Sequence, residues 1–279
     1  MKISEICEKK SDSQITQMTT DVLKFEREKT KMKNRKPLQG VLNIIRFNWH
    51  FYLMALIVLM VFSLIRNQFP QPIQTILSVG IVISFFTLLT SLMVSFYIYD
   101  LSDLYRLKWI ENTDNKKILN INAGFDETSE IIISKFPQTD LTICDFYDPA
   151  QHTEISIKRA GKLFPPKLKT ISVATEQLPF PENSFDRSFA ILSAHEIRDE
   201  NERIRFFREL NRVTKDQIFV TEHLRDFNNF MAYTIGVFHF HSRKTWQKTF
   251  EEADLTIQQE IRTTPFVTTF VLEKNGNTL

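Results

Sequence analysis

Two long runs without Asp, Glu, Lys or Arg lie close together near the N-terminus. The first covers residues 47–65 and the second covers residues 73–99. At about 1.5 Å per residue, the shorter run forms a helix of roughly 30 Å, the thickness of a bilayer core. Pro70 and Pro72 in the link end one helix and begin the next. We expect a two-helix transmembrane hairpin over residues 47–99; a hairpin buried in a soluble core is the weaker alternative.

Basic residues around these runs predict the orientation. The link carries Arg66 alone, whereas Arg106 and Lys108 follow the second run. Eight basic residues lie shortly before the first run: Lys24, Arg27, Lys29, Lys31, Lys33, Arg35, Lys36 and Arg46. The positive-inside rule therefore places both termini in the cytoplasm and makes this an integral protein of the inner or plasma membrane. Residues 24–36 are either a topology signal only or also a contact with anionic lipid.

These features divide the chain into four parts. Residues 1–46 form a basic cytoplasmic segment, 47–99 the hairpin, 100–111 an interfacial connector and 112–279 a soluble domain. An aromatic belt and an interfacial helix are expected where Tyr97, Tyr99, Tyr105 and Trp109 lie. Cys7 and Cys144 are the only cysteines, which excludes a disulfide framework or a cysteine zinc site. The formal net charge of +2 gives no reason to expect nucleic acid as a partner.

The soluble domain has the pattern of an α/β protein with a parallel sheet, because short apolar runs alternate with amphipathic helical stretches. We expect strands at residues 117–121, 141–144, 170–173, 185–192 and 217–220, and a closing hairpin at 255–261 and 266–272. Helices are expected at residues 128–136, 150–161, 200–213 and 246–253.

One spacing within this pattern indicates a ligand. Gly124 follows the first strand, and Asp145 ends the second strand 21 residues later. In nucleotide-binding α/β folds such an acid receives ribose hydroxyls, and the first turn lets the backbone approach the ligand. Two of the usual glycines are missing here, so the spacing alone leaves nucleotide binding undecided.

A longer motif points to a family. Residues 176–186 read Glu-Gln-Leu-Pro-Phe-Pro-Glu-Asn-Ser-Phe-Asp, and they are followed by His195 and by Phe-Arg-Glu-Leu-Asn-Arg-Val at 207–213. This run resembles the class I S-adenosylmethionine-dependent methyltransferases, in the branch with a Leu-Pro-Phe motif, and the resemblance covers about residues 112–279. It implies a Rossmann-like seven-stranded methyltransferase sheet with a C-terminal β-hairpin, preceded here by two transmembrane helices, and S-adenosylmethionine as the cofactor.

The resemblance also implies the cofactor-binding residues. Three positions depart from the family pattern, because Asn120 replaces an acid, Asn122 replaces a glycine and Ala174 replaces an Asp. The implied set runs from the first motif through the ribose-binding acid to the segment beside the adenine: Asn120, Asn122, Gly124, Asp145, Phe146, Thr175 and Glu176.

Two strand ends in this domain look alike, and each carries a candidate catalytic residue. His195 begins the run His-Glu-Ile-Arg-Asp after the fourth strand, and His223 lies in Glu-His-Leu-Arg-Asp after the fifth. His195 is the first candidate for a general base and His223 the second; for both, a structural strut is the alternative. Arg198 either holds an anionic head group or pairs with Glu196, and we favour the ion pair.

Two further features lie after the fifth strand. His239 and His241 share one side if that segment is extended, but their spacing from Glu196 and Glu222 matches no standard ligand pattern, so we expect no metal site. The apolar stretch 227–240 either covers an acceptor pocket or packs in the core.

Three functions remain to be separated. The leading hypothesis is a membrane-anchored methyltransferase that acts on a lipophilic small molecule or lipid at the cytoplasmic face of the bilayer. The second is a degenerate, non-catalytic methyltransferase-like module for binding or scaffolding. A short-chain dehydrogenase is disfavoured, because the soluble domain contains no Tyr-x-x-x-Lys motif. The sequence indicates neither the acceptor atom nor the oligomeric state.

Overall fold

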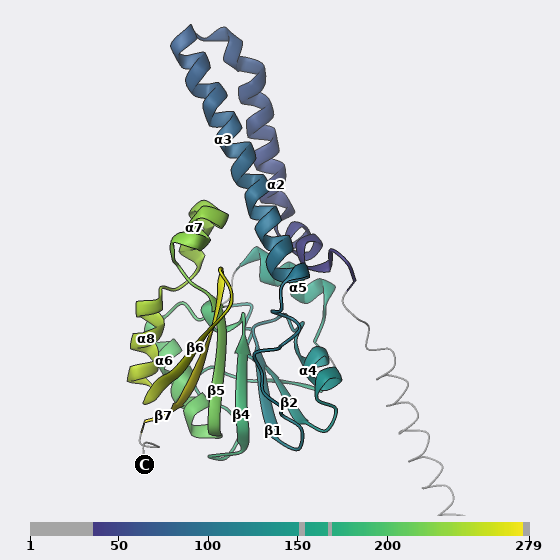
Figure 1. Cartoon of the computed structure of the whole chain (residues 1–279), viewed down its shortest axis with the longest axis vertical. Coiled ribbons are helices and arrows are strands. Elements are labelled where there is room, and N and C mark those ends of the chain that lie inside the picture. Colours follow the sequence, from purple (N-terminus) through teal and green to yellow (C-terminus); the bar gives the residue numbers. More distant parts are fainter. Residues whose placement is uncertain (1–35, 151–153, 167–168, 276–279) are drawn as a thin grey trace, which may run out of the picture. The chain divides into compact units, whose positions relative to one another are not determined.

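The computed structural model describes residues 36–150, 154–166 and 169–275. The chain divides into two units, Met1–Lys36 and Pro37–Leu279, and the description below concerns the second. The basic residues between 24 and 35 lie outside the described residues, as does Cys7. The second unit consists of a helical hairpin followed by a sheet with helices around it (Figure 1).

The sheet has the order β3-β2-β1-β4-β5-β7-β6. The strands from β1 to β5 pair in parallel, β7 is antiparallel to β5, and β6 is antiparallel to β7. The predicted fold class is therefore confirmed, including the C-terminal hairpin. The strands are β1 (Lys117–Asn122), β2 (Asp140–Asp145), β3 (Thr170–Ser172), β4 (Phe185–Ile191), β5 (Thr214–His223), β6 (Leu255–Thr264) and β7 (Val267–Lys274). Because the carboxyl ends of parallel strands share one edge, the loops after β1, β2, β4 and β5 meet there.

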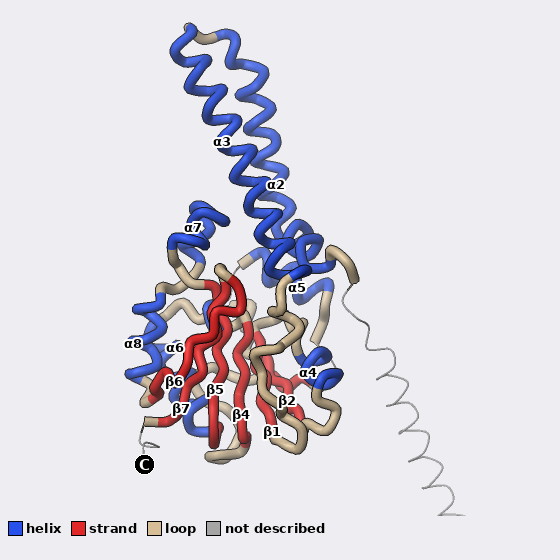
Figure 2. Tube along the Cα trace, viewed as in Figure 1, coloured by secondary structure: helices blue, strands red, loops and turns tan. Residues whose placement is uncertain are grey.

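Helices surround this sheet, as Figure 2 shows in blue against the red strands. The strongly periodic helix α6 begins where the Asp199 side chain accepts a hydrogen bond from Glu202 N at 2.8 Å. Its apolar face, with Phe206, Phe207 and Leu210, is fully buried. The helices of this part are α4 (Ser129–Lys135), α5 (Ile155–Leu163), α6 (Glu200–Val213), α7 (Phe227–Tyr233) and α8 (Arg243–Glu252), with short 3-10 segments at η3 (Ala194–Glu196) and η4 (Thr234–His239).

The segment 100–111 packs into the domain. Leu107, Trp109 and Ile110 are buried in a core cluster with Phe189 and Phe219. No helix continues past Leu101 in this segment. The expected interfacial helix and the aromatic-belt position of Trp109 are therefore wrong. The physical reason is burial: Trp109 is 9% exposed and its ring lies 6.3 Å from that of Phe219, so its apolar surface is removed from water inside the domain.

The N-terminal hairpin consists of α2 (Gln39–Ile65), η1 (Arg66–Gln68), α3 (Gln71–Phe96) and the single π-turn η2 (Tyr97–Leu101). Both helices are long and apolar enough to cross a membrane, and their apolar windows are not buried within the structure. A core helix of a soluble domain hides such residues, whereas here Leu64 and Ile76 are both 70% exposed. Helix α2 begins eight residues before the uncharged run, because a helix continues through Arg46.

Polar and aromatic contacts join the base of the hairpin to the carboxyl edge of the sheet. The Phe47 ring in α2 lies 5.2 Å from Phe125 in the loop after β1. Asn43 Nδ2 donates to Glu127 Oε1 at 3.1 Å in the same loop. At the end of the second helix, the Tyr99 hydroxyl lies 2.8 Å from His223 Nε2, at the end of β5. The edge that carries the candidate site is thus the edge that the hairpin contacts.

Candidate functional site

The loop after β1 is fixed to the end of β2. Gly124 has a φ of +79°, and its N–H donates to Asp145 Oδ1 at 2.8 Å. The same carboxylate oxygen accepts from Tyr147 N at 2.9 Å. A Cβ atom at Gly124 would lie 2.8 Å from Tyr147 Cγ, so only glycine suits this position. The structure therefore brings together the two residues whose spacing indicated a ligand.

Asn120 supplies an unpaired acceptor at the same edge. Its side chain is fully buried at the end of β1, and Nδ2 donates to Thr128 Oγ1 at 3.0 Å and Ser129 Oγ at 2.8 Å. Among the described residues, Asn120 Oδ1 has no hydrogen-bond partner. An unpaired buried carbonyl is costly, and it suits a donor such as an ammonium group. Asn122, two residues on, is also buried, with Nδ2 3.5 Å from Cys144 O.

The remaining implied cofactor residues differ in their surroundings. Phe146 is buried, and its ring packs 5.2 Å from that of Phe206. The buried Thr175 hydroxyl donates to Glu202 at 2.6 Å, whereas Glu176 is exposed. Their binding roles stay predictions. The first loop fits the charged end of S-adenosylmethionine, because it offers an unpaired acceptor, a glycine turn and a carboxylate.

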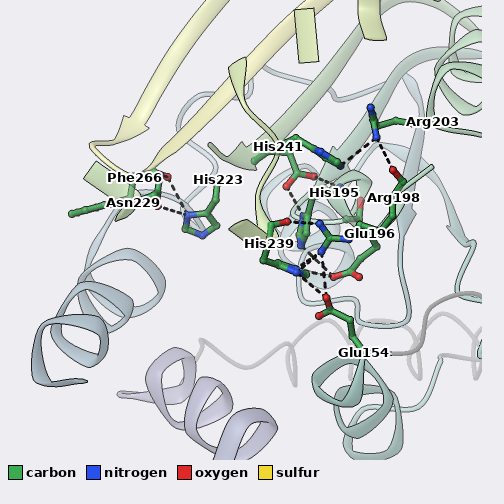
Figure 3. A network of polar contacts seen from close by, with 12 residues as sticks. Glu154, His195, Glu196, Arg198, Arg203, His223, Asn229, His239, His241 and Phe266 are labelled. Carbon is green, nitrogen blue, oxygen red and sulfur yellow. Dashed lines mark hydrogen bonds and ion pairs between the residues drawn. The ribbon is translucent and has the colours of Figure 1, made fainter. Parts of the chain in front are cut away.

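The ends of β4 and β5 place His195 between the carboxylates of Glu196 and Glu222. Figure 3 labels His195 and Glu196. His195 Nδ1 lies 2.6 Å from Glu222 Oε2, and its backbone N–H donates to Glu222 Oε1 at 3.2 Å. On the other side, His195 Nε2 lies 3.2 Å from Glu196 Oε1. Burial by itself lowers the pKa of His195, but Glu222 and Glu196 outweigh it and raise the pKa to about 10. A ring held in this way is a hydrogen-bond donor at neutral pH, so its general-base role stays a prediction.

His239 reaches the same cluster from the segment after α7. Its Nδ1 lies 2.8 Å from Glu154 Oε1 and its Nε2 lies 3.6 Å from Glu196 Oε1. Arg198 pairs with Glu154 at 3.3 Å and donates to the carbonyl of His239 at 2.5 Å. The predicted pairing of Arg198 with Glu196 is wrong, because Glu196 is buried against the two imidazoles while Arg198 lies on the exposed side.

His241 belongs to a different environment. Its Nε2 lies 3.3 Å from Arg203 Nη1, and its ring packs edge-on to Trp246. Burial first, and then the nearby Arg203, lower its pKa to about 3. The segment is a 3-10 helix up to His239, so the extended backbone that would place His239 and His241 on one side is not present there.

His223 connects elements in this structure. Its Nδ1 lies 3.1 Å from the carbonyl of Phe266 and 3.2 Å from Asn229 Oδ1, so Nδ1 carries the proton and donates it. Nε2 then accepts from the Tyr99 hydroxyl. Both ring nitrogens of His223 are hydrogen-bonded to other parts of the chain, as expected of a structural histidine. The catalytic role of His223 stays a prediction.

The stretch 227–240 forms α7 and η4 and exposes most of its apolar side chains. Phe227, Ile235 and Phe238 are 74%, 82% and 66% exposed. The Tyr233 hydroxyl lies 3.5 Å from Ser95 Oγ in α3, so this stretch adjoins the hairpin. Core packing therefore does not account for these residues, although Ala232 and Val237 are buried.

Sequence reasoning missed two members of the site. Glu154 lies at the start of α5 and Tyr147 lies two residues after Asp145, and neither belongs to a motif with fixed spacing. Glu222 was not missed, because the sequence already shows acids next to histidines at the ends of both strands.

Comparisons with known proteins add a family to this geometry. Residues 140–220 match the family described as "Methyltransferase domain". No curated protein matches the chain. Among solved structures, the chain is similar to a SAM-dependent methyltransferase from Aquifex aeolicus, with 15% identity, a TM-score of 0.45, and coverage of 62% of this chain and 89% of that one. It is also similar to SAM-dependent methyltransferases from Methanosarcina mazei, with 15% identity, a TM-score of 0.40, and coverage of 58% and 92%.

The matched segment runs from the start of β2 into β5 and contains the Leu-Pro-Phe motif, Asp145 and His195. The matched segment therefore includes the motifs from which the resemblance to methyltransferases was predicted. Residues 140–220 are thus similar to a methyltransferase domain, and they lie within a seven-stranded Rossmann-like sheet with the order β3-β2-β1-β4-β5-β7-β6.

Proposed function

We propose that this chain is a membrane-anchored S-adenosylmethionine-dependent methyltransferase that acts on a lipophilic small molecule or lipid at the cytoplasmic face of the bilayer. One observation carries the proposal: the base of the apolar hairpin contacts the carboxyl edge of the sheet through Phe47 and Tyr99. That edge holds the loop of Gly124 and Asp145, where ligands of open α/β sheets bind.

Three residues of this edge would hold the cofactor. Asn120 Oδ1 would accept from the ammonium group, the Gly124 turn would admit the ligand to the backbone, and Asp145 would accept from the ribose hydroxyls. When bound, S-adenosylmethionine supplies an electrophilic methyl group. The chain itself has to align the acceptor with that group and exclude water.

An apolar surface next to the hairpin supports a lipophilic acceptor. We call it the α7 surface, defined by the exposed side chains Phe227, Phe230, Met231, Ile235 and Phe238. Exposed apolar patches of this kind mark membrane or ligand contacts in soluble domains. Tyr233 on the same helix lies against Ser95 of α3, so the surface continues from the second predicted span.

The charged cluster of His195, Glu196 and Glu222 lies at the same edge, at the ends of β4 and β5. A polar group carried by an otherwise apolar acceptor would find hydrogen-bonding partners there. If that group is a hydroxyl, it has to lose a proton during the transfer, and the carboxylates of Glu196 and Glu222 are the groups of this cluster that could take it.

One observation favours the alternative of a non-catalytic module: Asn120 and Asn122 stand where the family has an acid and a glycine. Calorimetry of the full chain in detergent, titrated with S-adenosylmethionine, separates the two. The enzyme hypothesis expects binding, followed by transfer of a labelled methyl group into solvent-extractable material from membrane vesicles. Absence of binding by the folded chain would favour the module, and binding without transfer to any vesicle lipid would contradict the lipophilic acceptor.

A further inference from the structure

We propose that His195, Glu196 and His239 form a binding site for one divalent transition-metal ion of the zinc class. Each residue offers one ligand atom, and the three atoms lie within 4.8 Å of one another. Figure 3 shows the three side chains converging from the end of β4 and from the segment before His241. This inference does not depend on methyl transfer, so either proposal can fail alone.

The two distances from Glu196 are close to those of tetrahedral coordination. Glu196 Oε1 lies 3.2 Å from His195 Nε2 and 3.6 Å from His239 Nε2. Ligand atoms around a tetrahedral zinc ion, with bonds of about 2.0–2.1 Å, lie roughly 3.3–3.4 Å apart. Two imidazoles and one carboxylate are a common donor set for zinc sites that keep a fourth position open.

Each imidazole also has the outer partner that metal-binding histidines require. His195 Nδ1 lies 2.6 Å from Glu222 Oε2, and His239 Nδ1 lies 2.8 Å from Glu154 Oε1. A carboxylate at Nδ1 fixes the proton on that nitrogen. A metal ion that binds His195 then has to displace only the Nε2 proton, which faces Glu196 in the metal-free chain. Both Nε2 atoms lie on the side of Glu196, so the two rings and their carboxylates repeat one arrangement around a common acid.

Burial and charge point the same way. The Glu196 and Glu222 side chains are 4% and 0% exposed, and such carboxylates need a cation close by. The protonated His195 supplies that charge in the metal-free chain, and a metal ion would supply it in place of the Nε2 proton. Arg198 is the competing cation, because its Nη2 contacts His239 at Nδ1 and, at 3.1 Å, at Nε2. Its side chain is 41% exposed, so it can turn towards solvent when a metal ion enters, at the cost of its contacts with Glu154 and with the carbonyl of His239.

The test uses the full chain in detergent, stripped with a chelator and titrated with Co²⁺ by visible absorption and with Zn²⁺ by competition. We expect one ion per chain. Glu196→Gln and His239→Asn should each weaken binding at least 10-fold, and Glu222→Gln should weaken it about 10–100-fold. Arg198→Met should strengthen binding. His241→Asn is the matched control, since it removes an imidazole two residues away that contacts Arg203 and should leave the affinity unchanged.

Two outcomes overturn the proposal. One is equal affinity in the wild-type, E196Q and H239N chains, which places the ion elsewhere. The other is the absence of binding at about 100 µM Co²⁺ or Zn²⁺, well above the dissociation constants of protein zinc sites. Thermal unfolding identifies any variant that fails to fold. His239 is partly exposed and outside the apolar core clusters, so H239N keeps the test decisive if E196Q unfolds.

Discussion

Asp145 was predicted from its spacing to Gly124, and the structure places the two residues in contact. One of its oxygens accepts the N–H groups of both Gly124 and Tyr147, so the side chain shapes the loop as well as offering charge to a ligand. A test of its ribose role must therefore keep the loop. Asp145→Asn does so, because an amide oxygen accepts the same two hydrogen bonds.

We expect Asp145→Asn to weaken S-adenosylmethionine binding by about 1.5–3 kcal/mol, the range for hydrogen bonds to charged groups. Calorimetry with S-adenosylhomocysteine measures the change without turnover. Asp140→Asn is the matched control, since Asp140 begins the same strand at the opposite edge. An unchanged affinity in the folded Asp145→Asn chain would remove the ribose role.

The second prediction at the residue scale concerns the pH dependence of stability that His223 causes. Burial lowers its pKa from about 6.5 in an exposed histidine to about 4. Between these values the unfolded chain binds a proton that the folded chain does not. Stability is therefore complete above pH 6.5 and falls as the pH falls towards 4, by up to about 3 kcal/mol.

Thermal unfolding in detergent at pH 7.5 and pH 5 measures this dependence. His223→Gln keeps a donor and an acceptor for Phe266 and Tyr99 but does not titrate. On acidification, the midpoint temperature of unfolding should fall less in the variant than in the wild-type chain. Equal losses would show that His223 does not carry this pH dependence.

At the scale of elements, the strands and α6 could be predicted from their apolar residues. These form short runs in the strands and repeat with the helical period in α6. Residues 102–111 could not, because their buried Leu104 and Leu107 lie in turns with no period. The start of α2 was predicted eight residues late, since the charge at Arg46 marks where an apolar run begins and not where a helix begins.

The candidate site was predicted unevenly for a similar reason. Gly124 and Asp145 follow strands at a fixed spacing, so the sequence brings them together. The cluster of Glu196 and His239 depends on how η4 folds back over the end of β4, and 43 residues separate the two in the sequence. No local pattern encodes such a contact, which is why no metal site was expected.

At the base of the hairpin, the start of α2 lies so close to η2 that position 40 has to be glycine. Gly40 belongs to no sequence motif. A Cβ atom at Gly40 would lie 2.3 Å from Tyr99 Cβ. Asp100 accepts from the N–H groups of Gly40 and Val41, both at 2.8 Å, and so caps α2 where its dipole favours a negative charge. This contact fixes the start of the first helix to the end of the second.

The α7 surface gives the prediction at this scale. In a chain with Cys7 replaced by Ser, a cysteine placed at Ile235 and labelled with an environment-sensitive dye should be quenched by nitroxide-labelled lipids in nanodiscs. The reason is that Ile235 is 82% exposed and follows Tyr233, which contacts Ser95 of α3, by two residues. A cysteine at Thr256, exposed at the opposite edge of the sheet, is the control. Equal quenching at the two sites would contradict contact of the α7 surface with lipid.

At the scale of the whole molecule, the basic residues predict topology. With Arg66 alone in the link and eight basic residues before the first run, the link should face outside. A cysteine at Gln68 should then react with an impermeant reagent in intact cells, in the chain lacking Cys7. Cys144 is buried and does not interfere. Reaction of a cysteine at Asn275 instead of Gln68 would reverse the orientation.

The last prediction concerns why the hairpin adjoins the site. If the acceptor dissolves in the bilayer, it should reach the carboxyl edge of the sheet without crossing water, and confinement to the membrane raises its effective concentration. A fragment starting at Asp100 keeps the buried residues Leu104, Leu107 and Trp109 but loses the Phe47 and Tyr99 contacts. We expect this fragment to fold and bind S-adenosylmethionine, yet to lose most of its turnover on vesicles that contain the native membrane lipids.

A second chain separates anchoring from entry. In it, an unrelated pair of transmembrane helices replaces residues 41–96, so the domain is held at the membrane without Asn43 or Phe47, which contact the loop after β1. If the hairpin only anchors, this chimera should regain full turnover. If the hairpin also guides the acceptor, the chimera should bind cofactor normally and stay slow. A soluble fragment as fast as the full chain would refute both roles, because neither confinement nor a lipid route would then limit the reaction.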